Sequence, residues 1–431
     1  MAHAATDAAI VRIAGRRVWD SRGRPTVEAE VHLAGGACGR AIAPAGASTG
    51  RGEAVDLRDG GAAFGGLDVT RAVAAVNGPI AAALAGMDAR DQAAVDARLV
   101  ELDGTADKAR LGGNALIAVS MAVAHAAAAA DGVPLWRRLA GGAEIRDMPL
   151  PEIQIFGGGA HAAGRVDLQD FMVVAVGAAH IAEAFDWTAE VYRAAGAVMK
   201  EKGAVAGVAD EGGWWPQFSG NEEALAALVQ AIERAGLRAG TDAAIAIDVA
   251  ATQFFRDGAY RLTADGMTLD RDRWLERLLG WCRAYPILSV EDPVEEGDAD
   301  GMRAFTAAAP AHLLVVADDF VTTHASRVAE AAAAGAANTA LIKPNQAGTL
   351  SEARAALDAA RAAGWSAIAS ARSGETEDTT IADLAVGWGA DQLKVGAFAR
   401  SERMAKWNAC LRIDEALGGR LPLRRPARWP R

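Results

Sequence analysis

The sequence has few cysteines, no long uninterrupted apolar run and no excess of positive charge, and each absence excludes a class of protein. Its 431 residues include three cysteines, Cys38, Cys282 and Cys410, which are far apart and not in metal-ligand spacing. They favour free thiols in a reducing cytoplasm over a disulfide framework. We expect no membrane-spanning helix, and we expect no secretory signal because the first residues lack a basic region followed by an apolar segment.

The net charge of −11 excludes some partners. A chain this acidic is poorly suited to nonspecific binding of nucleic acid or of an anionic membrane, so we expect neither as a partner. The negative net charge does not exclude a small anionic substrate, because a bound divalent cation and a few basic side chains reverse the charge locally. The length suggests two or three domains, and the apolar fraction of 51% is sufficient for large cores.

The first third of the sequence predicts a small α+β domain. Residues 10–58 contain three alternating, strand-like segments separated by Gly-rich or Pro turns, which is typical of a three-stranded meander. Residues 69–141 are rich in Ala and have apolar residues at helical spacing. Residues 148–151 resemble a linker. We therefore predict a small N-terminal α+β domain over residues 1–143.

From residue 150 onward the pattern alternates between strand and helix, which predicts an α/β barrel over residues 144–431. Two helix starts can be recognised. Thr349 and Glu352 form a capping box, and Asn221, which precedes two acids, is predicted to be an N-cap. Ala-rich tracts such as residues 331–337 have high helix propensity and fit the outer helices of a (β/α)8 barrel.

Charged residues follow several apolar runs in this second part. Glu291, Asp318 and Lys343 succeed one another at intervals of 27 and 25 residues, the length of one strand plus one helix. Asp248 and Lys394 end two further runs. Polar groups at the C-terminal ends of consecutive parallel strands are where a (β/α)8 barrel holds its chemistry. We therefore expect these five residues on one rim.

The three acids of this set predict a metal site. A single acid at a strand end is more often a helix cap or a turn residue. Three on successive strands would repel one another unless a cation lay between them. Oxygen ligands favour Mg²⁺, so we predict that Asp248, Glu291 and Asp318 bind this ion. Asp319 is expected to point the other way.

The two lysines predict a general base. A lysine at a barrel rim is usually a solvated charge, but Lys343 and Lys394 follow buried runs and are expected to point into one cavity. An ammonium close to Mg²⁺ and to another ammonium loses stability as a cation, so we predict that their pKa values are lowered. Such a lysine is suited to remove a proton near neutral pH.

Other polar residues lie in loops. The Gly-rich segments 44–50 and 156–161 are plain turns or, beside a cation site, lids that close over it. Glu211 lies among flexible residues, which suits an acid that protonates a leaving group. Arg372 and Ser373 follow another predicted strand and offer a guanidinium fork and a hydroxyl to a phosphate group.

These motifs together resemble the enolase (phosphopyruvate hydratase) family over nearly the whole length of the chain. The matching segments are residues 20–28, 46–50, 210–213, 247–250, 290–293, 318–319, 343–346, 372–378 and 400–403. The resemblance implies an enolase-type (β/α)8 barrel with an N-terminal α+β lid domain. It also implies two Mg²⁺ ions, a small anionic phosphorylated substrate and a homodimer or octamer.

The resemblance implies roles for the catalytic residues. The three predicted Mg²⁺ ligands match the family's ligands for the tightly bound ion, and Ser48 matches the lid residue that helps to bind a second one. Lys343 matches the base that removes the α-proton of 2-phosphoglycerate. Lys394 matches the lysine that neutralises the substrate carboxylate, and Glu211 the acid that assists departure of hydroxide.

The remaining matches concern the substrate and the lids. Arg372 and Ser373 resemble the family's phosphate site. His161 resembles a lid histidine, and Gln169 resembles its neighbouring loop residue. Gly46 belongs to the first lid, and we place it among the substrate-binding residues.

Two departures from the family pattern change the expected chemistry. Enolases carry a histidine where this chain has Ala371, and a glutamate where it has Asp170. We keep Asp170 among the catalytic residues and Ala371 among the substrate-binding residues. The groups for proton abstraction are intact, whereas the surroundings of Glu211, which serves dehydration, are altered.

Three hypotheses follow. The first is an enolase-type lyase that gives phosphoenolpyruvate or a related enol phosphate. The second is a diverged enolase of phosphonate or phosphinate biosynthesis, similar to carboxyphosphonoenolpyruvate synthase, in which the space at Ala371 admits a second substrate. The third is a non-catalytic binding or scaffold protein, which the full set of metal and lysine residues disfavours.

Overall fold

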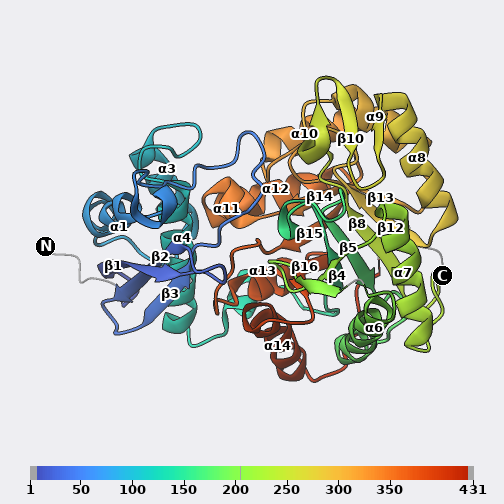
Figure 1. Ribbon diagram of the computed structural model, residues 1–431. Coiled ribbons are helices and arrows are strands. Elements are labelled where there is room, and N and C mark those ends of the chain that lie inside the picture. Colours follow the sequence, from blue (N-terminus) through green and yellow to red (C-terminus); the bar gives the residue numbers. More distant parts are fainter. Residues whose placement is uncertain (1–6, 204, 426–431) are drawn as a thin grey trace, which may run out of the picture.

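The computed structural model describes residues 7–203 and 205–425, and Figure 1 shows a small sheet with helices (blue) beside a barrel surrounded by helices (green to red). In the N-terminal part, β1 (Ile10–Trp19), β2 (Pro25–Leu33) and β3 (Cys38–Ile42) pair antiparallel in that order. This confirms the predicted three-stranded meander.

One face of this sheet is covered by helix α4 (Gly113–Ala130). Side chains alternate along β2, so that Val27 and Val31 are fully buried on this face. Gly39 of β3 lies so close to α4 that a Cβ atom there would collide with the helix backbone. Helix α4 has the length and composition of a membrane span, but 83% of it is buried within the protein, as in a core helix.

The remaining N-terminal helices are short. They are α1 (Thr70–Ala75), α2 (Ala81–Leu84), α3 (Gln92–Asp103) and α5 (Leu135–Leu139). The segment between β3 and α1 is a long loop with one short 3₁₀ helix (Ala63–Gly66), and it extends to the barrel, where Ala45 and Gly374 exchange backbone hydrogen bonds of 2.9 and 2.8 Å. This contact brings the first Gly-rich loop to the barrel rim.

The second part of the chain forms a closed barrel of eight strands. In order around the barrel they are β4 (Leu150–Gly157), β5 (Asp170–Val174), β8 (Ala244–Asp248), β12 (Ile287–Glu291), β13 (Leu314–Ala317), β14 (Thr339–Ile342), β15 (Ser366–Ser370) and β16 (Gln392–Ala397). Strand β16 pairs with β4 and closes the barrel, which confirms the predicted fold.

One strand departs from the regular (β/α)8 pattern. Strand β5 runs antiparallel to both of its neighbours, β4 and β8. The chain reaches β5 through loop 158–169, which contains no crossover α-helix. A parallel strand needs such a crossover, so a strand reached directly through a loop runs in the opposite direction.

Helices surround the barrel in Figure 1. They are α6 (Ile181–Glu201), α7 (Asn221–Arg234), α8 (Arg271–Ala284), α9 (Ala299–Ala308), α10 (Ala325–Ala333), α11 (Pro344–Ala347), α12 (Leu350–Ala362), α13 (Thr380–Trp388) and α14 (Ser401–Ala416). Two short strands, β6 (Val205–Val208) and β7 (Trp214–Pro216), form a hairpin beside β4. A separate small sheet contains β9 (Phe255–Arg256), β10 (Ala259–Leu262) and β11 (Met267–Leu269).

The two predicted helix starts have different outcomes. Thr349 is confirmed as the N-cap of α12, because its hydroxyl accepts a hydrogen bond from the backbone N–H of Glu352, and the same hydroxyl donates to the Glu352 carboxylate at 2.8 Å. The prediction for Asn221 is wrong, since Gly220 is the N-cap of α7. The Asn221 side chain instead accepts a hydrogen bond from the backbone of Asp167 at 2.9 Å, so a tertiary contact replaces the local cap.

Candidate active site

The predicted acids and lysines gather at one end of the barrel. Asp248 and Glu291 are the last residues of β8 and β12, and they are paired in register. Lys343 directly follows β14, and Lys394 lies in β16. Because parallel strands end at the same rim, these side chains come together although they are far apart in the sequence.

A cavity lies at this rim, with an empty volume of about 330 Å³ including its open mouth. Twelve of the fourteen predicted site residues line it: Gly46, Ser48, His161, Gln169, Asp170, Glu211, Asp248, Lys343, Ala371, Arg372, Ser373 and Lys394. The other two, Glu291 and Asp318, are outside the lining, but each contacts one of the lysines.

The two lysines form ion pairs with the predicted metal ligands. Lys394 Nζ donates to Asp248 Oδ2 at 2.9 Å and to Glu291 Oε2 at 2.7 Å, and Lys343 pairs with Asp318. Burial disfavours both ammonium groups, but the attraction of these carboxylates outweighs it and raises the pKa of each lysine. The prediction that the pKa values of the two lysines are lowered is therefore wrong when only protein groups are considered. It left out the direct contact between each lysine and an acid.

The acids at the rim have the chemistry of a hard-cation site. Glu291 Oε1 is buried and has no hydrogen-bond partner among the residues that the structure describes. A buried carboxylate oxygen is costly in free energy unless a donor or a cation reaches it. Asp248 Oδ2 accepts a hydrogen bond from Gln169 at 2.9 Å, which fixes its orientation. The donor set therefore fits Mg²⁺ or a similar cation bound by oxygen ligands.

The closest group of acids at the rim differs from the predicted ligand set. One oxygen from each of Asp292, Asp318 and Asp319 lies within 4.8 Å of the other two. Asp292 accepts hydrogen bonds from the backbone N–H groups of Asp318 at 3.0 Å and Asp319 at 2.8 Å. Asp319 does not line the cavity and faces a neighbouring pocket, as expected, although one of its carboxylate oxygens stays close to Asp318 and Asp292. Asp292 was not predicted, although it directly follows Glu291 and precedes a proline.

A second polar group contains His161. Its Nδ1 atom is 3.0 Å from Asp170 Oδ1, and its Nε2 atom is 3.7 Å from Glu211 Oε1. Burial disfavours the imidazolium, but attraction to Asp170 and Glu211 outweighs it and raises the pKa of His161 to about 9. Burial also raises the pKa of Glu211. This group can hold a proton next to a bound substrate at neutral pH.

Gln154 connects this group to the loop that contains Glu211. Its amide nitrogen donates to Asp170, and its Oε1 atom accepts from the backbone N–H of Gly213 at 2.7 Å. Gln154 is fully buried in β4. It was not predicted from the sequence, and the available signal was a glutamine that, with Glu152, interrupts a mostly apolar strand.

Arg372 places its guanidinium at one end of the cavity. Its guanidinium donates to Glu53 Oε2 at 3.0 Å and to the backbone carbonyl of Ser48 at 3.0 Å. The Ser373 hydroxyl accepts a hydrogen bond from Arg22 at 3.3 Å. Glu53 and Arg22 were not predicted. Both come from the N-terminal part, so the two parts of the chain build this end of the site together.

Ala371 lies in the cavity wall between β15 and Arg372. Its backbone N–H donates to the carbonyl of Lys394 at 2.9 Å, so the methyl group has a fixed place beside the lysine. His161 is the one histidine among the described residues that line the cavity, and it is paired with Asp170. The wall at Ala371 therefore offers no acid or base.

The closed barrel with a reversed second strand, the N-terminal loop at its rim and the acids and lysines at its strand ends define an enzyme of the enolase superfamily. Comparison with known families agrees: the model of the enolase N-terminal domain matches residues 10–139, and the model of the enolase C-terminal TIM barrel domain matches residues 146–423. The chain belongs to the enolase family.

Proposed function

We propose that this protein is a Mg²⁺-dependent carbon–oxygen lyase that converts 2-phosphoglycerate to phosphoenolpyruvate by way of an enolate. The observation that carries the proposal is the single cavity in which Lys343 and Lys394 lie between acids and Arg372. A base, a carboxylate-binding cation and a phosphate-binding guanidinium are the groups that this reaction needs.

The residues that would hold Mg²⁺ are Asp248, Glu291 and Asp318, with Ser48 from the first Gly-rich loop for a second ion. When bound, Mg²⁺ would stabilise negative charge on the carboxylate of the substrate. The family match and the unpartnered Glu291 oxygen support this assignment.

The protein groups divide the reaction into two proton transfers. Lys343 removes the proton from C2, and the two electrons of that bond move into the carboxylate, whose charge Lys394 neutralises. Glu211 then donates a proton to the C3 hydroxyl, the electron pair of the enolate returns to form the C2=C3 double bond, the C3–O bond breaks, and water leaves. Lys343 has to lose its own proton first, and its ion pair with Asp318 opposes that loss.

A direct assay tests this function. Purified protein is mixed with 2-phosphoglycerate and Mg²⁺, and formation of phosphoenolpyruvate is followed by its ultraviolet absorbance. We expect turnover that EDTA abolishes and that Lys343→Ala reduces by about 10²–10⁴-fold, the usual contribution of a positioned base. Lys202→Ala is the matched control, since this lysine pairs with Glu223 on the surface. Absence of phosphoenolpyruvate at every Mg²⁺ concentration would overturn the proposal.

A second candidate function rests on Ala371. Because the wall there carries only a methyl group, a second anionic group would be placed beside Arg372 in a diverged enolase similar to carboxyphosphonoenolpyruvate synthase. In that case the enolate would form without elimination of water. Incubation in deuterated water distinguishes the two candidate functions. Exchange of the C2 proton without formation of phosphoenolpyruvate supports the second candidate. Absence of both exchange and turnover supports a binding protein.

Assembly and location are also proposed from family membership. We expect a homodimer or octamer in the cytoplasm, with no nucleic acid or membrane as partner. Light scattering of the purified protein tests the assembly, since a monomeric mass would contradict it.

A further inference from the structure

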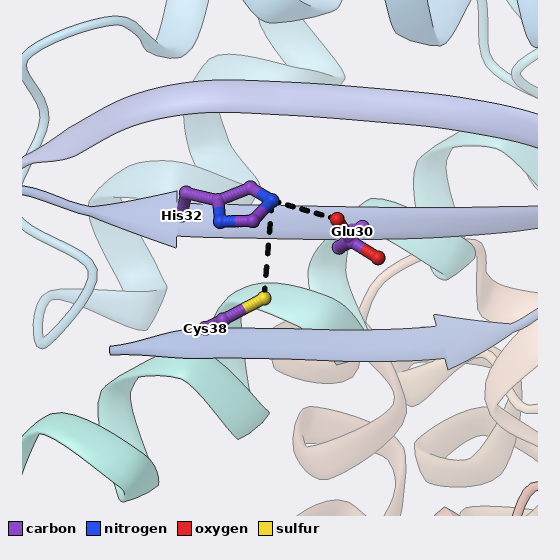
Figure 2. Close-up of side chains that lie close together, drawn as sticks. All are labelled: Glu30, His32 and Cys38. Carbon is purple, nitrogen blue, oxygen red and sulfur yellow. Dashed lines mark hydrogen bonds and ion pairs between the residues drawn. The ribbon is translucent and has the colours of Figure 1, made fainter. Parts of the chain in front are cut away.

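Three side chains of different chemistry meet on the outer face of the N-terminal sheet, away from α4 (Figure 2). Glu30 and His32 project from β2, two residues apart and therefore on one face of the sheet. Cys38 begins β3 and is paired in register with His32. Strand pairing thus places a carboxylate, an imidazole and a thiol side by side.

The distances between these groups are close to those of a metal site. His32 Nε2 is 2.7 Å from Glu30 Oε1 and 4.0 Å from Cys38 Sγ, and one potential ligand atom of each residue lies within 4.8 Å of the others. In a tetrahedral zinc site, the usual bond lengths separate sulfur from nitrogen by about 3.6 Å and nitrogen from oxygen by about 3.4 Å. Small side-chain rotations would therefore bring all three atoms to one ion.

We infer that Glu30, His32 and Cys38 form a surface site for Zn²⁺ or a similar transition-metal ion, with water as the fourth ligand. A thiolate and an imidazole select such ions, whereas Mg²⁺ prefers oxygen ligands alone. None of the three residues lines the cavity at the barrel rim. The site is therefore separate from the proposed Mg²⁺ site and has a different ion preference.

The surrounding charges leave the metal-facing atoms accessible. Arg16 donates to Glu30 Oε2 at 3.2 Å and also pairs with Glu28, so its charge is directed at the other oxygen of Glu30. The hydrogen bond from His32, followed by that from Arg16, lowers the pKa of Glu30, which stays a carboxylate at neutral pH. Cys38 is exposed, whereas Cys282 and Cys410 are buried.

Exposure of Cys38 provides a local readout that does not depend on enzyme activity. The full-length protein is treated with a thiol-alkylating reagent, and labelling of the Cys38 peptide is followed by mass spectrometry. We expect stoichiometric Zn²⁺ to slow labelling at least about tenfold, because a metal-bound thiolate is shielded and no longer free to react. EDTA should restore the rate, and Mg²⁺ should have no effect.

Matched variants show whether the imidazole of His32 takes part. His32→Gln keeps a hydrogen-bonding group beside Glu30 but loses the imidazole, and we expect it to weaken zinc binding at least about 100-fold. Protection is taken for each variant as the ratio of its labelling rates without and with Zn²⁺, because loss of the imidazole beside Cys38 also changes the rate without metal. His324→Gln is the control, since His324 is an exposed histidine next to Ser326, in another part of the fold. It should keep the full protection by Zn²⁺.

Cobalt gives an independent test of the cysteine. Co²⁺ bound at this site should produce a thiolate charge-transfer band that is absent in Cys38→Ser. Two results would overturn the inference: no protection of Cys38 by stoichiometric Zn²⁺, or equal protection in His32→Gln and His324→Gln, which would mean that the thiol binds the ion without the cluster.

Discussion

The guanidinium of Arg372 donates a hydrogen bond to the backbone carbonyl of Ser48 at 3.0 Å. Ser48 belongs to the Gly-rich loop of the N-terminal part, and Arg372 follows strand β15 of the barrel. The same guanidinium pairs with Glu53, which lies just beyond this loop. A substrate phosphate would therefore compete for the donors that hold the loop, so phosphate binding and loop position are coupled.

The first prediction concerns this guanidinium. Arg372→Lys keeps the positive charge but removes the planar fork, and one ammonium cannot serve Ser48, Glu53 and a phosphate together. We expect kcat/KM for 2-phosphoglycerate to fall about 10²-fold, the loss of one or two charge-assisted hydrogen bonds. Arg327→Lys is the control, because Arg327 donates to the carbonyl of Arg51 at 2.8 Å outside the cavity. Equal losses in both variants would contradict the role of Arg372.

The second prediction concerns the cation. Asp248→Asn keeps the shape of the side chain but removes a charge from the proposed ligand set, so we expect Mg²⁺ affinity to fall at least about 10-fold. Calorimetric titration with Mg²⁺ measures this affinity without substrate. Asp257→Asn is a suitable control, since this exposed aspartate, in the turn between β9 and β10, pairs with Arg261 and does not line the cavity. An unchanged affinity in Asp248→Asn would remove this residue from the ligand set.

The third prediction tests Gln154 as a positioning residue. Gln154→Ala leaves Asp170 and the backbone N–H of Gly213 without this hydrogen-bond partner. His161, which pairs with Asp170, and the loop of Glu211 should then no longer be held in a fixed position relative to each other. We expect a stability loss of about 1–3 kcal/mol and a lower kcat with little change in KM. Asn338→Ala is the matched control, because Asn338 also makes hydrogen bonds to buried backbone, at Leu313 and Val315.

The two variants separate a structural role from a catalytic one. Both should lower the midpoint of thermal unfolding by similar amounts, whereas Gln154→Ala alone should lower kcat. If kcat falls equally in both, the effect of Gln154 is one of general stability.

The fourth prediction restores the missing histidine. Ala371→His places an imidazole in the cavity wall beside Arg372, and we expect it to raise the rate of dehydration relative to the rate of C2 proton exchange. Measuring both rates on the same sample gives their ratio directly. Ala371→Ser fills part of the space without adding an acid–base group and serves as control. An unchanged ratio would mean that the alanine does not limit dehydration.

The place of the site could be predicted from the sequence, whereas its contacts could not. Each apolar run and its final charged residue are local features, so the rim position of Glu291 and Lys343 followed from strand length alone. Lys394, however, reaches Asp248 and Glu291 from 146 and 103 residues away. Such pairings depend on barrel closure and register, which local periodicity does not encode.

The errors have a common physical cause. Asn221 obeys the local preference for a helix cap, but its side chain gains more from the buried backbone of Asp167. Asp292 was missed because its partners come from the turn after β13, where the backbone N–H groups of Asp318 and Asp319 donate to its carboxylate. In both places, a buried polar group needed a partner, and this need outweighed the local pattern.

The fifth prediction concerns a buried acid below the cavity. Glu152 of β4 accepts a hydrogen bond from Gln392 Nε2 at 3.0 Å, while Gln392 Oε1 is buried without a partner among the described residues. Burial raises the pKa of Glu152 from 4.5 to about 7, although Lys394 opposes this change. A protonated Glu152 could donate to the unpartnered oxygen of Gln392, which a carboxylate cannot do.

The sign of the pH effect follows from this raised pKa. In the unfolded chain, Glu152 ionises near pH 4.5, whereas in the folded protein its pKa is about 7. The free energy of unfolding therefore begins to fall near pH 4.5, and the full loss is reached above about pH 7. Glu152→Gln removes that cost and supplies a permanent donor to Gln392. We expect the variant to gain up to about 3 kcal/mol over the wild type at pH 8 and little at pH 5, measured by urea unfolding. Glu330→Gln, an exposed site on α10, should show no such difference. Parallel stability curves for Glu152→Gln and the wild type would show that Glu152 is charged in the folded protein throughout this range.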